Sequence, residues 1–433
     1  MKRGKSPLPM GEGRGEGIMR ILIFSTAYFP HVGGAEVAVK EITDRLSHKA
    51  SDGKPEVDFD MITVRLDSKD AKQEKIGNIN VYRIGWGLGR INKLLFPFRA
   101  SRLASKLHKK EKYDIIWSIM ASFSGFAALF FKKKNPEVKF LLTLQEGDDL
   151  REPERKAWLV KNWFKQIFTK ADYIQCISNY LADWARKMNA NCPVEVVPNG
   201  VTVGKSQIPI RQLADKSQRN FKLQIQNSKV ILTTSRLVKK NGVEDLIIAF
   251  SKLLRLTTYD SRLIICGDGE EKSKLEKLIK KLDVADRVEF KGFVEPAELS
   301  EYYAIADVFC RPSLSEGLGI SFLEAMAYSV PVVATNVGGI KDFLKHKETG
   351  YVCEVNNPES IAEQIKYILD PQNRDEVEGV KRSARQMVIE KYNWGKIAPQ
   401  MRNIFLNVIA SEVQPLARGG TKRSNPVRIN DIY

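Results

Sequence analysis

The chain has 433 residues, 43% of them hydrophobic and 28% charged, which is enough for two globular domains with separate cores. Its formal net charge of +17 indicates anionic partners, and its longest apolar run, residues 123–131, is far shorter than the roughly 20 residues of a membrane-spanning helix. The five cysteines are scattered without disulfide or zinc spacing, so we interpret them as core thiols of a cytoplasmic protein.

Both ends of the chain are predicted to lie outside the folded domains. Residues 1–18 are rich in glycine, proline and charge and lack the apolar stretch of a secretory signal, so we expect a disordered extension with Met19 as the natural start. Residues 413–433 are polar and basic and contain Gly-Gly and Asn-Pro, which predicts a disordered tail.

Between these ends, short apolar runs alternate with longer segments of helical periodicity, which is typical of parallel sheets covered by helices. Two of the helical segments are residues 35–46 and 242–254. The pattern predicts an α/β protein with two Rossmann-like, doubly wound domains that face a central cleft. The predicted strands form two series, at residues 21–25, 57–64, 79–84, 115–119, 140–144, 173–177 and 194–197, then at 230–234, 262–266, 287–291, 308–311 and 330–334.

A polar segment rich in Gln, Lys and Asn, residues 204–228, separates the two series of strands. Linkers of this composition commonly join domains. We therefore place one domain at residues 19–205 and the other at residues 206–395.

The loops that follow strands carry the residues of interest, because ligands of such folds bind at the carboxyl ends of the strands. The first strand leads through His31 and the glycine pair Gly33 and Gly34 into a helix, where backbone can approach a ligand closely. A glycine pair alone is equally consistent with a tight turn.

In the second series, a basic turn follows the strand at residues 230–234. It contains Arg236, Lys239 and Lys240 and again leads into a helix. Fixed cations beside a helix N-terminus can neutralise a diphosphate without a metal, although a solvated basic turn remains an equal alternative. The loop at residues 267–270 is better explained as a strand-to-helix turn.

Residues 311–327 contain two carboxylates, Glu316 and Glu324, around a Gly-x-Gly. Glu316 lies in a Ser/Gly-rich loop and Glu324 in the predicted helix that follows, so both can face one ligand at the helix N-terminus. Glycoside hydrolases also use carboxylate pairs, but a hydrolase would not explain the phosphate-type loops.

Taken in order, these motifs resemble the retaining glycosyltransferases of family 4. The shared features are the Gly33/Gly34 loop, the Arg236 turn with its lysines, and the pair Glu316 and Glu324, together with the motifs at residues 197–201, 267–269 and 338–339. The resemblance extends from residue 19 to about residue 409. It implies a GT-B fold, in which residues 19–205 bind the acceptor, residues 206–395 bind the nucleotide sugar, and a helix at residues 396–412 crosses back onto the first domain.

The resemblance also implies a role for individual residues. Glu324 would bind the ribose hydroxyls, Glu316 the donor sugar, and Arg236 with Lys240 the diphosphate. Lys239 competes with Lys240, because Asn241 stands where many family members have the lysine. The remaining donor-binding positions offer main-chain N–H groups or a close approach of the backbone: Gly33, Gly34, Gly317, Leu318, Gly319 and Ile320.

The chain departs from the family at Gln145, where many members have a histidine. Gln145 can bind a sugar hydroxyl but cannot titrate near neutral pH. His31 is a weaker candidate for contact with the acceptor. The Asp148-Asp149 pair lacks the Asp-x-Asp spacing of a metal site, so we expect no metal and no cofactor besides the nucleotide-sugar donor.

The implied reaction moves a sugar from a nucleoside-diphosphate donor to the hydroxyl of a lipid-linked or carbohydrate acceptor, with retention at the anomeric carbon, in polysaccharide or glycolipid biosynthesis. The resemblance further implies attack from the front face, with the departing phosphate taking the acceptor's proton. A GT-B epimerase or phosphorylase is the alternative. A basic nucleic-acid-binding protein is a distant one, since no nucleic-acid motif is present.

Two segments, residues 91–110 and 158–170, mix cations with bulky apolar residues. Two interpretations stay open for them. Either they dock peripherally on the anionic inner face of the cell membrane, or their apolar faces are ordinary core.

Overall fold

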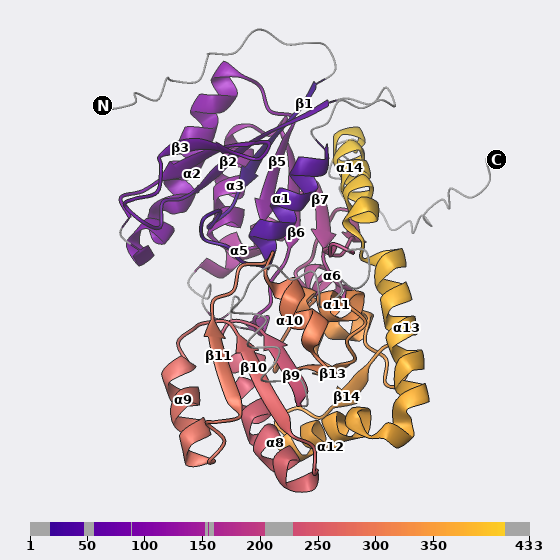
Figure 1. Cartoon of the computed structure of the whole chain (residues 1–433). Helices are drawn as coiled ribbons and strands as arrows, with labels where there is room; N and C mark the ends of the chain where they lie inside the picture. The colour runs from indigo at the N-terminus through magenta and orange to yellow at the C-terminus, as the bar shows by residue number, and fades with distance from the viewer. Residues whose placement is uncertain are drawn as a thin grey trace, which may run out of the picture.

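The computed structural model describes residues 18–46, 56–87, 89–151, 155, 160–203 and 228–411 (Figure 1). Three predicted segments lie outside these ranges: residues 1–17 of the N-terminal extension, the C-terminal tail, and most of the polar segment between the domains. The described part contains two sheets, as the sequence predicts, and each is covered by helices on both faces (Figure 1).

The first sheet has eight strands in the order β3-β4-β2-β1-β5-β6-β7-β8. Neighbouring strands are parallel except for the β3–β4 pair. The strands are β1 (Ile18–Phe24), β2 (Glu56–Val64), β3 (Gln73–Ile76), β4 (Ile79–Ile84), β5 (Ile115–Ile119), β6 (Lys139–Leu144), β7 (Tyr173–Cys176) and β8 (Val194–Val196). The helices are α1 (Gly34–Leu46), α2 (Gly89–Lys110), α3 (Phe123–Lys134), α5 (Lys161–Thr169) and α6 (Asn179–Lys187).

The second sheet has six parallel strands in the order β11-β10-β9-β12-β13-β14. They are β9 (Lys229–Thr234), β10 (Ser261–Cys266), β11 (Val288–Gly292), β12 (Val308–Arg311), β13 (Val332–Thr335) and β14 (Tyr351–Cys353). The helices are η3 (Lys239–Asn241), α8 (Val243–Leu256), α9 (Lys272–Lys281), α10 (Leu299–Ile305), α11 (Ile320–Ala327), η4 (Gly338–Asp342), α12 (Pro358–Leu369), η5 (Pro371–Asn373), α13 (Arg374–Lys391) and α14 (Trp394–Ala410).

The strands are buried because helices cover both faces of each parallel sheet. Along β1, Ile21 and Ile23 face the layer that contains α1 and α14, whereas Leu22 and Phe24 face the layer that contains α2 and α3. All four side chains are fully buried. This continuous burial is why the strands appear in the sequence as apolar runs without alternation.

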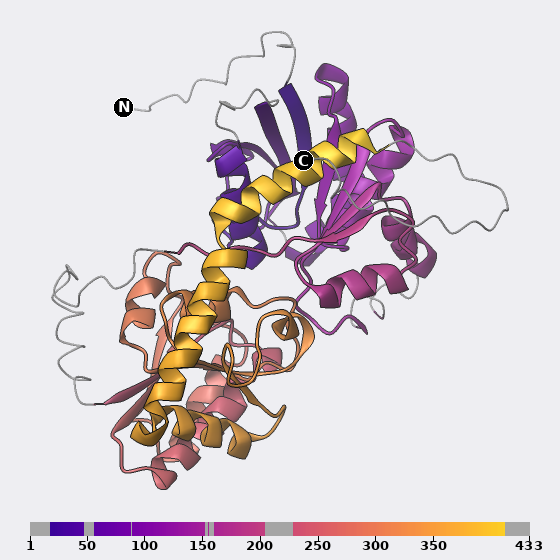
Figure 2. The same ribbon diagram turned by 90° about the vertical axis from the view of Figure 1, so that its right-hand side faces the viewer.

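The last helix crosses from the second domain to the first. α13 lies along the second domain, and α14 packs on α1, β5 and β6 of the first (Figure 2). The ring of Phe405 meets Trp117 of β5 edge-on, with centroids 5.2 Å apart. At the crossing point Trp394 packs against Gly200, where a Cβ would lie 2.7 Å from the indole ring. The two halves of the chain are therefore tied together on the side opposite α2 and α3.

None of the described helices is long and apolar enough to cross a membrane. The five cysteines are free thiols, and four of them are buried. Burial raises the pKa of Cys266 and Cys353 to about 12, which keeps these thiols protonated and unreactive near neutral pH.

Candidate functional site

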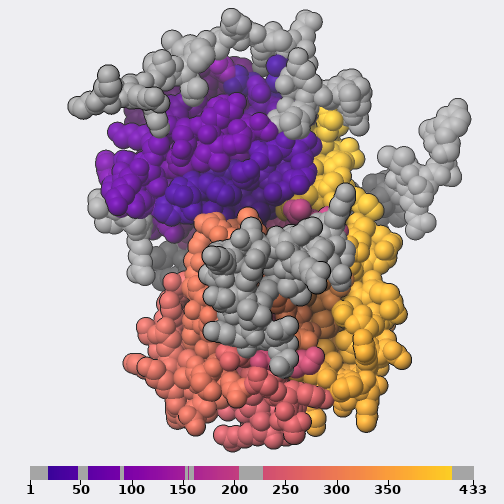
Figure 3. Space-filling view, in the orientation of Figure 1, coloured from indigo at the N-terminus to yellow at the C-terminus, as the bar shows by residue number. Residues whose placement is uncertain are grey.

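Figure 3 shows the first domain, in indigo and violet, resting against the orange part of the second domain. The loop after β6 and the loop after β12 meet between the two domains. A Cβ on Gly147 would lie 2.9 Å from Lys240 Nζ and 3.7 Å from Glu316 Oε1. A Cβ on Gly317 would lie 2.3 Å from the carbonyl oxygen of Glu146, so a side chain at this position would collide with backbone. The glycines thus allow two loops from different domains to approach at the backbone level.

The N-terminus of α11 faces the first domain. Gly319 has a φ of +90° and precedes the helix, a conformation that favours glycine. On the other side of the cleft, a Cβ on Gly34 would lie 3.3 Å from Ile320 Cδ1. The predicted glycine pair of the first domain and the predicted helix start of the second therefore lie next to each other.

Lys240 points toward the meeting point of the two loops. Its Nζ lies 2.9 Å from Asp148 Oδ1 of the first domain. Lys239 is exposed, and Asn241 is buried, with its side-chain amide donating to the carbonyl oxygen of Arg236 at 2.7 Å. Of these three residues, Lys240 is the one whose charge is directed into the cleft.

Glu316 forms an ion pair with Arg311. The side chains of Glu316 and Arg311 are only 14% and 8% exposed. Arg311 also donates to Ser321 Oγ at 2.8 Å and lies over the ring of Phe322, 4.3 Å from its centroid. The other carboxylate oxygen of Glu316 accepts a hydrogen bond from Gly317 N at 3.1 Å. Arg311 therefore fixes the orientation of the predicted sugar-binding glutamate.

Glu324 is held by Tyr303 of α10, whose hydroxyl donates to Glu324 Oε2 at 2.8 Å. The same hydroxyl lies 3.0 Å from Thr234 Oγ1 at the end of β9, so Thr234 acts as its donor. Burial raises the pKa of Tyr303 well above its usual value, which keeps the phenol protonated, and burial also raises the pKa of Glu324. Tyr303 thus occupies one oxygen of Glu324 and directs the carboxylate.

Arg236 is exposed and lies at the edge of this group, within electrostatic reach of Glu36. Burial raises the pKa of Glu36, and the positive charge of Arg236 opposes that shift. Glu36 Oε2 accepts a hydrogen bond from Gly33 N at 2.8 Å. Glu36 therefore accepts the hydrogen bond of an N–H group that the sequence predicts to lie near the diphosphate. Asp148 likewise pairs with Lys240, which the sequence predicts to bind the diphosphate.

Gln145 is buried at the end of β6, and its Oε1 accepts a hydrogen bond from Asn199 Nδ2 at 3.0 Å. His31 is turned toward the loop before β3, where its Nε2 lies 3.1 Å from Asp70 Oδ2. Among the described residues, no group of three or more His, Cys, Asp or Glu side chains is placed to hold a metal ion.

Sequence reasoning assigned no role to Glu146. Its Oε1 accepts a hydrogen bond from Ala121 N at 2.6 Å, while its buried Oε2 has no partner. Burial raises the pKa of Glu146 from 4.5 to about 7, and the neighbouring charge of Asp148 adds to the shift. The signal that could have pointed to it is its place two residues after β6, a strand buried at all positions but its first.

We expect Glu146 to make the protein less stable as the pH rises. Because its pKa is raised in the folded state, its contribution to stability is complete below pH 4.5 and is lost as the pH rises through about 7. The loss between about pH 5 and pH 8.5 amounts to about 2.5 kcal/mol. Denaturant unfolding at the two pH values should show this decrease in the free energy of unfolding in the wild type and not in Glu146→Gln. An equal pH dependence in both proteins would contradict the assignment.

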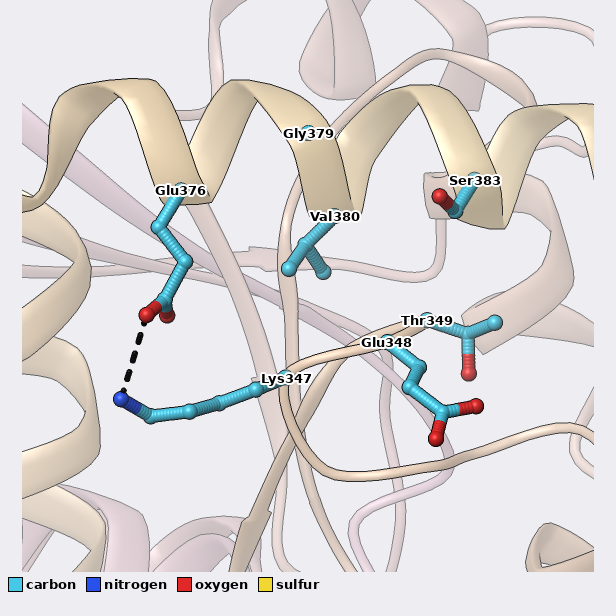
Figure 4. A pocket seen from close by; sticks show the side chains of 7 residues that line it. All are labelled: Lys347, Glu348, Thr349, Glu376, Gly379, Val380 and Ser383. Atoms are coloured by element: carbon cyan, nitrogen blue, oxygen red, sulfur yellow. Dashed lines mark hydrogen bonds and ion pairs between the residues drawn. The ribbon is translucent and has the colours of Figure 1, made fainter.

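The hollow drawn in Figure 4 lies elsewhere on the second domain and includes none of these residues. It lies between α13 and the turn before β14, and an ion pair with Lys347 Nζ 3.3 Å from Glu376 Oε2 closes one end. It contains none of the predicted donor-binding residues and carries no part of the site. It is lined by Lys347, Glu348, Thr349, Glu376, Gly379, Val380 and Ser383.

Comparison with known proteins agrees with this arrangement. Residues 32–205 match the family described as "Glycosyltransferase Family 4", and residues 215–387 match "Glycosyl transferases group 1". An uncharacterized glycosyltransferase of Methanocaldococcus jannaschii is 30% identical over 89% of this chain and 98% of its own length. N-acetyl-alpha-D-glucosaminyl L-malate synthase of Bacillus anthracis is 26% identical over 91% of this chain and 99% of its own length.

Solved structures show the same fold. Sucrose-phosphate synthase from Thermosynechococcus elongatus superposes with a TM-score of 0.75 at 20% identity, covering 91% of this chain and 100% of that one. HepE from Anabaena, in complex with UDP and glucose, superposes with a TM-score of 0.69 at 17% identity, covering 90% and 100%. The GT-B fold predicted from the motifs is thereby confirmed, and the chain belongs to glycosyltransferase family 4.

Proposed function

We propose that this glycosyltransferase moves a sugar from a nucleoside-diphosphate donor to an acceptor hydroxyl with retention of the anomeric configuration. The observation that carries the proposal is the meeting of Lys240 Nζ, Glu316 and Gly317 beside Gly147, between the two domains. This geometry puts a cation, a hydrogen-bonding carboxylate and the start of a helix around one space. Such a set suits a phosphorylated sugar.

In this proposal the donor lies along the second domain. Oε1 of Glu324 accepts hydrogen bonds from the ribose hydroxyls, since Tyr303 engages Oε2. Glu316 binds hydroxyls of the donor sugar in the orientation that Arg311 imposes. Lys240 and the N-terminus of α11 stabilise the diphosphate, which must displace Asp148 from the lysine.

The bond between the anomeric carbon and the diphosphate oxygen breaks, and both electrons stay on that oxygen. The acceptor oxygen forms the new bond on the same face, and its proton passes to the departing phosphate. The negative charge that develops on the leaving group is matched by Lys240 and, from the edge of the site, by Arg236. Because these cations fill the role, we propose that no catalytic metal is required.

We further propose that the donor sugar is a hexose and that the acceptor is a lipid-linked or carbohydrate hydroxyl of polysaccharide or glycolipid biosynthesis. Support comes from relatives: one is named an alpha-monoglucosyldiacylglycerol synthase and another a GDP-mannose-dependent phosphatidylinositol monomannoside mannosyltransferase. The test is a thermal-shift screen of nucleotide sugars, followed by mass and NMR analysis of the products. An acceptor-linked sugar of retained configuration is expected. An epimerised nucleotide sugar without transfer would contradict the proposal.

Glu324→Gln is expected to weaken binding of the preferred nucleotide sugar by about ten- to hundred-fold, because a hydrogen bond to a charged group contributes about 1.5–3 kcal/mol. The amide keeps an oxygen for the Tyr303 hydroxyl, so the fold should persist. Titration calorimetry measures the affinity, with Glu363→Gln on the exposed face of α12 as the matched control. Full affinity in Glu324→Gln would refute the ribose assignment.

A further inference from the structure

The first domain exposes a connected apolar surface on the side formed by α2, α3 and α5. Phe98 of α2 stacks on Phe130 of α3 with ring centroids 5.1 Å apart, and Phe130 meets Trp163 of α5 edge-on at 5.5 Å. Leu94 lies one helical turn before Phe98. Leu94, Phe98 and Trp163 are 63%, 61% and 47% exposed. We call Leu94, Phe98, Phe130 and Trp163 the apolar ridge.

The apolar ridge is more than scattered surface hydrophobics, because neighbouring helices supply its members and their rings touch. Single exposed apolar residues are normal on soluble proteins, whereas a contiguous patch marks a contact surface. The described helices α2 and α3 pack closely together, and α3 packs on α5 (Figure 1). The surface is therefore built into the fold and does not depend on a loop.

Positive charge surrounds the apolar ridge without any acidic partner on the same helices. The sequences of α2, α3 and α5 contain no Asp or Glu, although the whole chain has 52. The ammonium group of Lys133 lies 5.5 Å from the ring centroid of Trp163, and the guanidinium of Arg99 lies 3.8 Å from that of the 59% exposed Trp86. Further exposed cations on these helices are Arg102, Lys106, Lys109, Lys110, Lys134 and Lys161.

We propose that the apolar ridge and the cations around it form a docking surface for an anionic lipid bilayer. Aromatic and aliphatic side chains enter the region between headgroups and acyl chains, while Lys and Arg reach the acidic headgroups. Of the two interpretations of residues 91–110 and 158–170, membrane docking then applies to their exposed residues. Phe96, Phe164 and Phe168, in the same segments, belong to the core.

Other occupants fit the surface less well. A second copy of this chain, docked through the same helices, would bring one set of cationic helices without Asp or Glu against another, and like charges would repel. A single-stranded nucleic acid needs free ring faces for its bases. Here Phe98 and Phe130 each cover one face of the other and Trp163 meets Phe130 edge-on, so fewer ring faces are left for bases.

The surface also lies on the domain that the family uses for the acceptor. α2 follows β4, and the loop after β4 is at the end of the sheet where the two domains meet, so Leu94 and Phe98 lie in the part of the helix nearer the cleft. Docking through the apolar ridge would bring the cleft close to acceptors embedded in a membrane. The inference needs no donor or acceptor, so its test is independent of the proposed reaction.

The test is flotation of the full chain with vesicles of phosphatidylglycerol and phosphatidylcholine, beside vesicles of phosphatidylcholine alone. The wild type is expected to float with the anionic vesicles, less so as salt increases. The double variant Phe98→Ser/Trp163→Ser should partition at least about ten-fold more weakly, because it loses two large apolar side chains. Lys133→Gln should weaken partitioning about five-fold.

Two variants in the second domain are matched controls. Leu256→Ser removes a 52% exposed side chain at the end of α8, and Lys280→Gln removes an exposed lysine of α9; neither should change flotation. Thermal unfolding of each variant checks the fold. The proposal is overturned if the wild type does not bind anionic vesicles at low salt, or if Phe98→Ser/Trp163→Ser binds them equally well. It is also overturned if that variant loses self-association or nucleic-acid retention while vesicle binding is absent.

Discussion

Replacing Lys240 by methionine should lower kcat by a factor of about 10²–10³, the usual cost of removing one group that stabilises transition-state charge. In the structure Lys240 Nζ lies 2.9 Å from Asp148 and faces Gly147. In the proposed reaction, this is where the departing diphosphate develops negative charge. Methionine keeps the length and the apolar part of the side chain. Steady-state kinetics with the preferred nucleotide sugar measures the change.

Lys239→Met is the matched control, because Lys239 is the adjacent residue, carries the same charge and is exposed. We expect it to change kcat by less than about three-fold, as is typical of a surface charge. The pair of variants also decides which lysine serves the diphosphate. A large loss in Lys239→Met with normal activity in Lys240→Met would reverse the assignment made from the geometry.

Most of the fold was predictable because buried parallel strands are continuous apolar runs. β4, β5 and β12 begin and end at the predicted residues, and the other predicted strands differ from the observed ones by up to three residues at an end. Two strands were missed for a physical reason. β3 is an exposed edge strand whose residues are mostly polar, and β14 is only three residues long, so neither produces an apolar run.

The site was predictable where the chemistry lies in a local motif. Glu316, Gly317 and Lys240 were named from their loops, and the structure brings them together. Their partners were not predictable, because a contact between residues far apart in the chain leaves no local pattern. Tyr303, which positions Glu324, lies 21 residues away in sequence, and Asp148, which pairs with Lys240, comes from the other domain.

The partners also explain why the site holds its shape without a ligand. Each of two predicted phosphate contacts is already matched by a carboxylate, Asp148 on Lys240 and Glu36 on Gly33 N. Lys240 is a cation and Gly33 N is a neutral N–H donor at the start of a helix, and a carboxylate is a favourable partner for each of them. A donor diphosphate brings the same charge and the same acceptor oxygens, so it can replace them without leaving a cation unpaired.

Arg311→Met is expected to destabilise the protein by about 3–5 kcal/mol, the cost of leaving one partner of a buried ion pair without its counter-charge. Arg311 is 8% exposed, and Glu316, with which it forms an ion pair, is 14% exposed. Methionine fills much of the space over the ring of Phe322 that the guanidinium occupies. Denaturant unfolding at neutral pH measures the loss of stability.

The double variant Arg311→Met/Glu316→Gln separates stability from function. It removes both charges of the ion pair, so its stability should recover part of the loss and exceed that of Arg311→Met, because Glu316 no longer carries a charge without its partner. Its transfer activity should stay low, since Glu316 can no longer offer a charged acceptor to the sugar hydroxyls. If the double variant were instead less stable than Arg311→Met, the ion pair would not be the reason for the loss. If it regained activity, Glu316 would not bind the donor sugar through its charge.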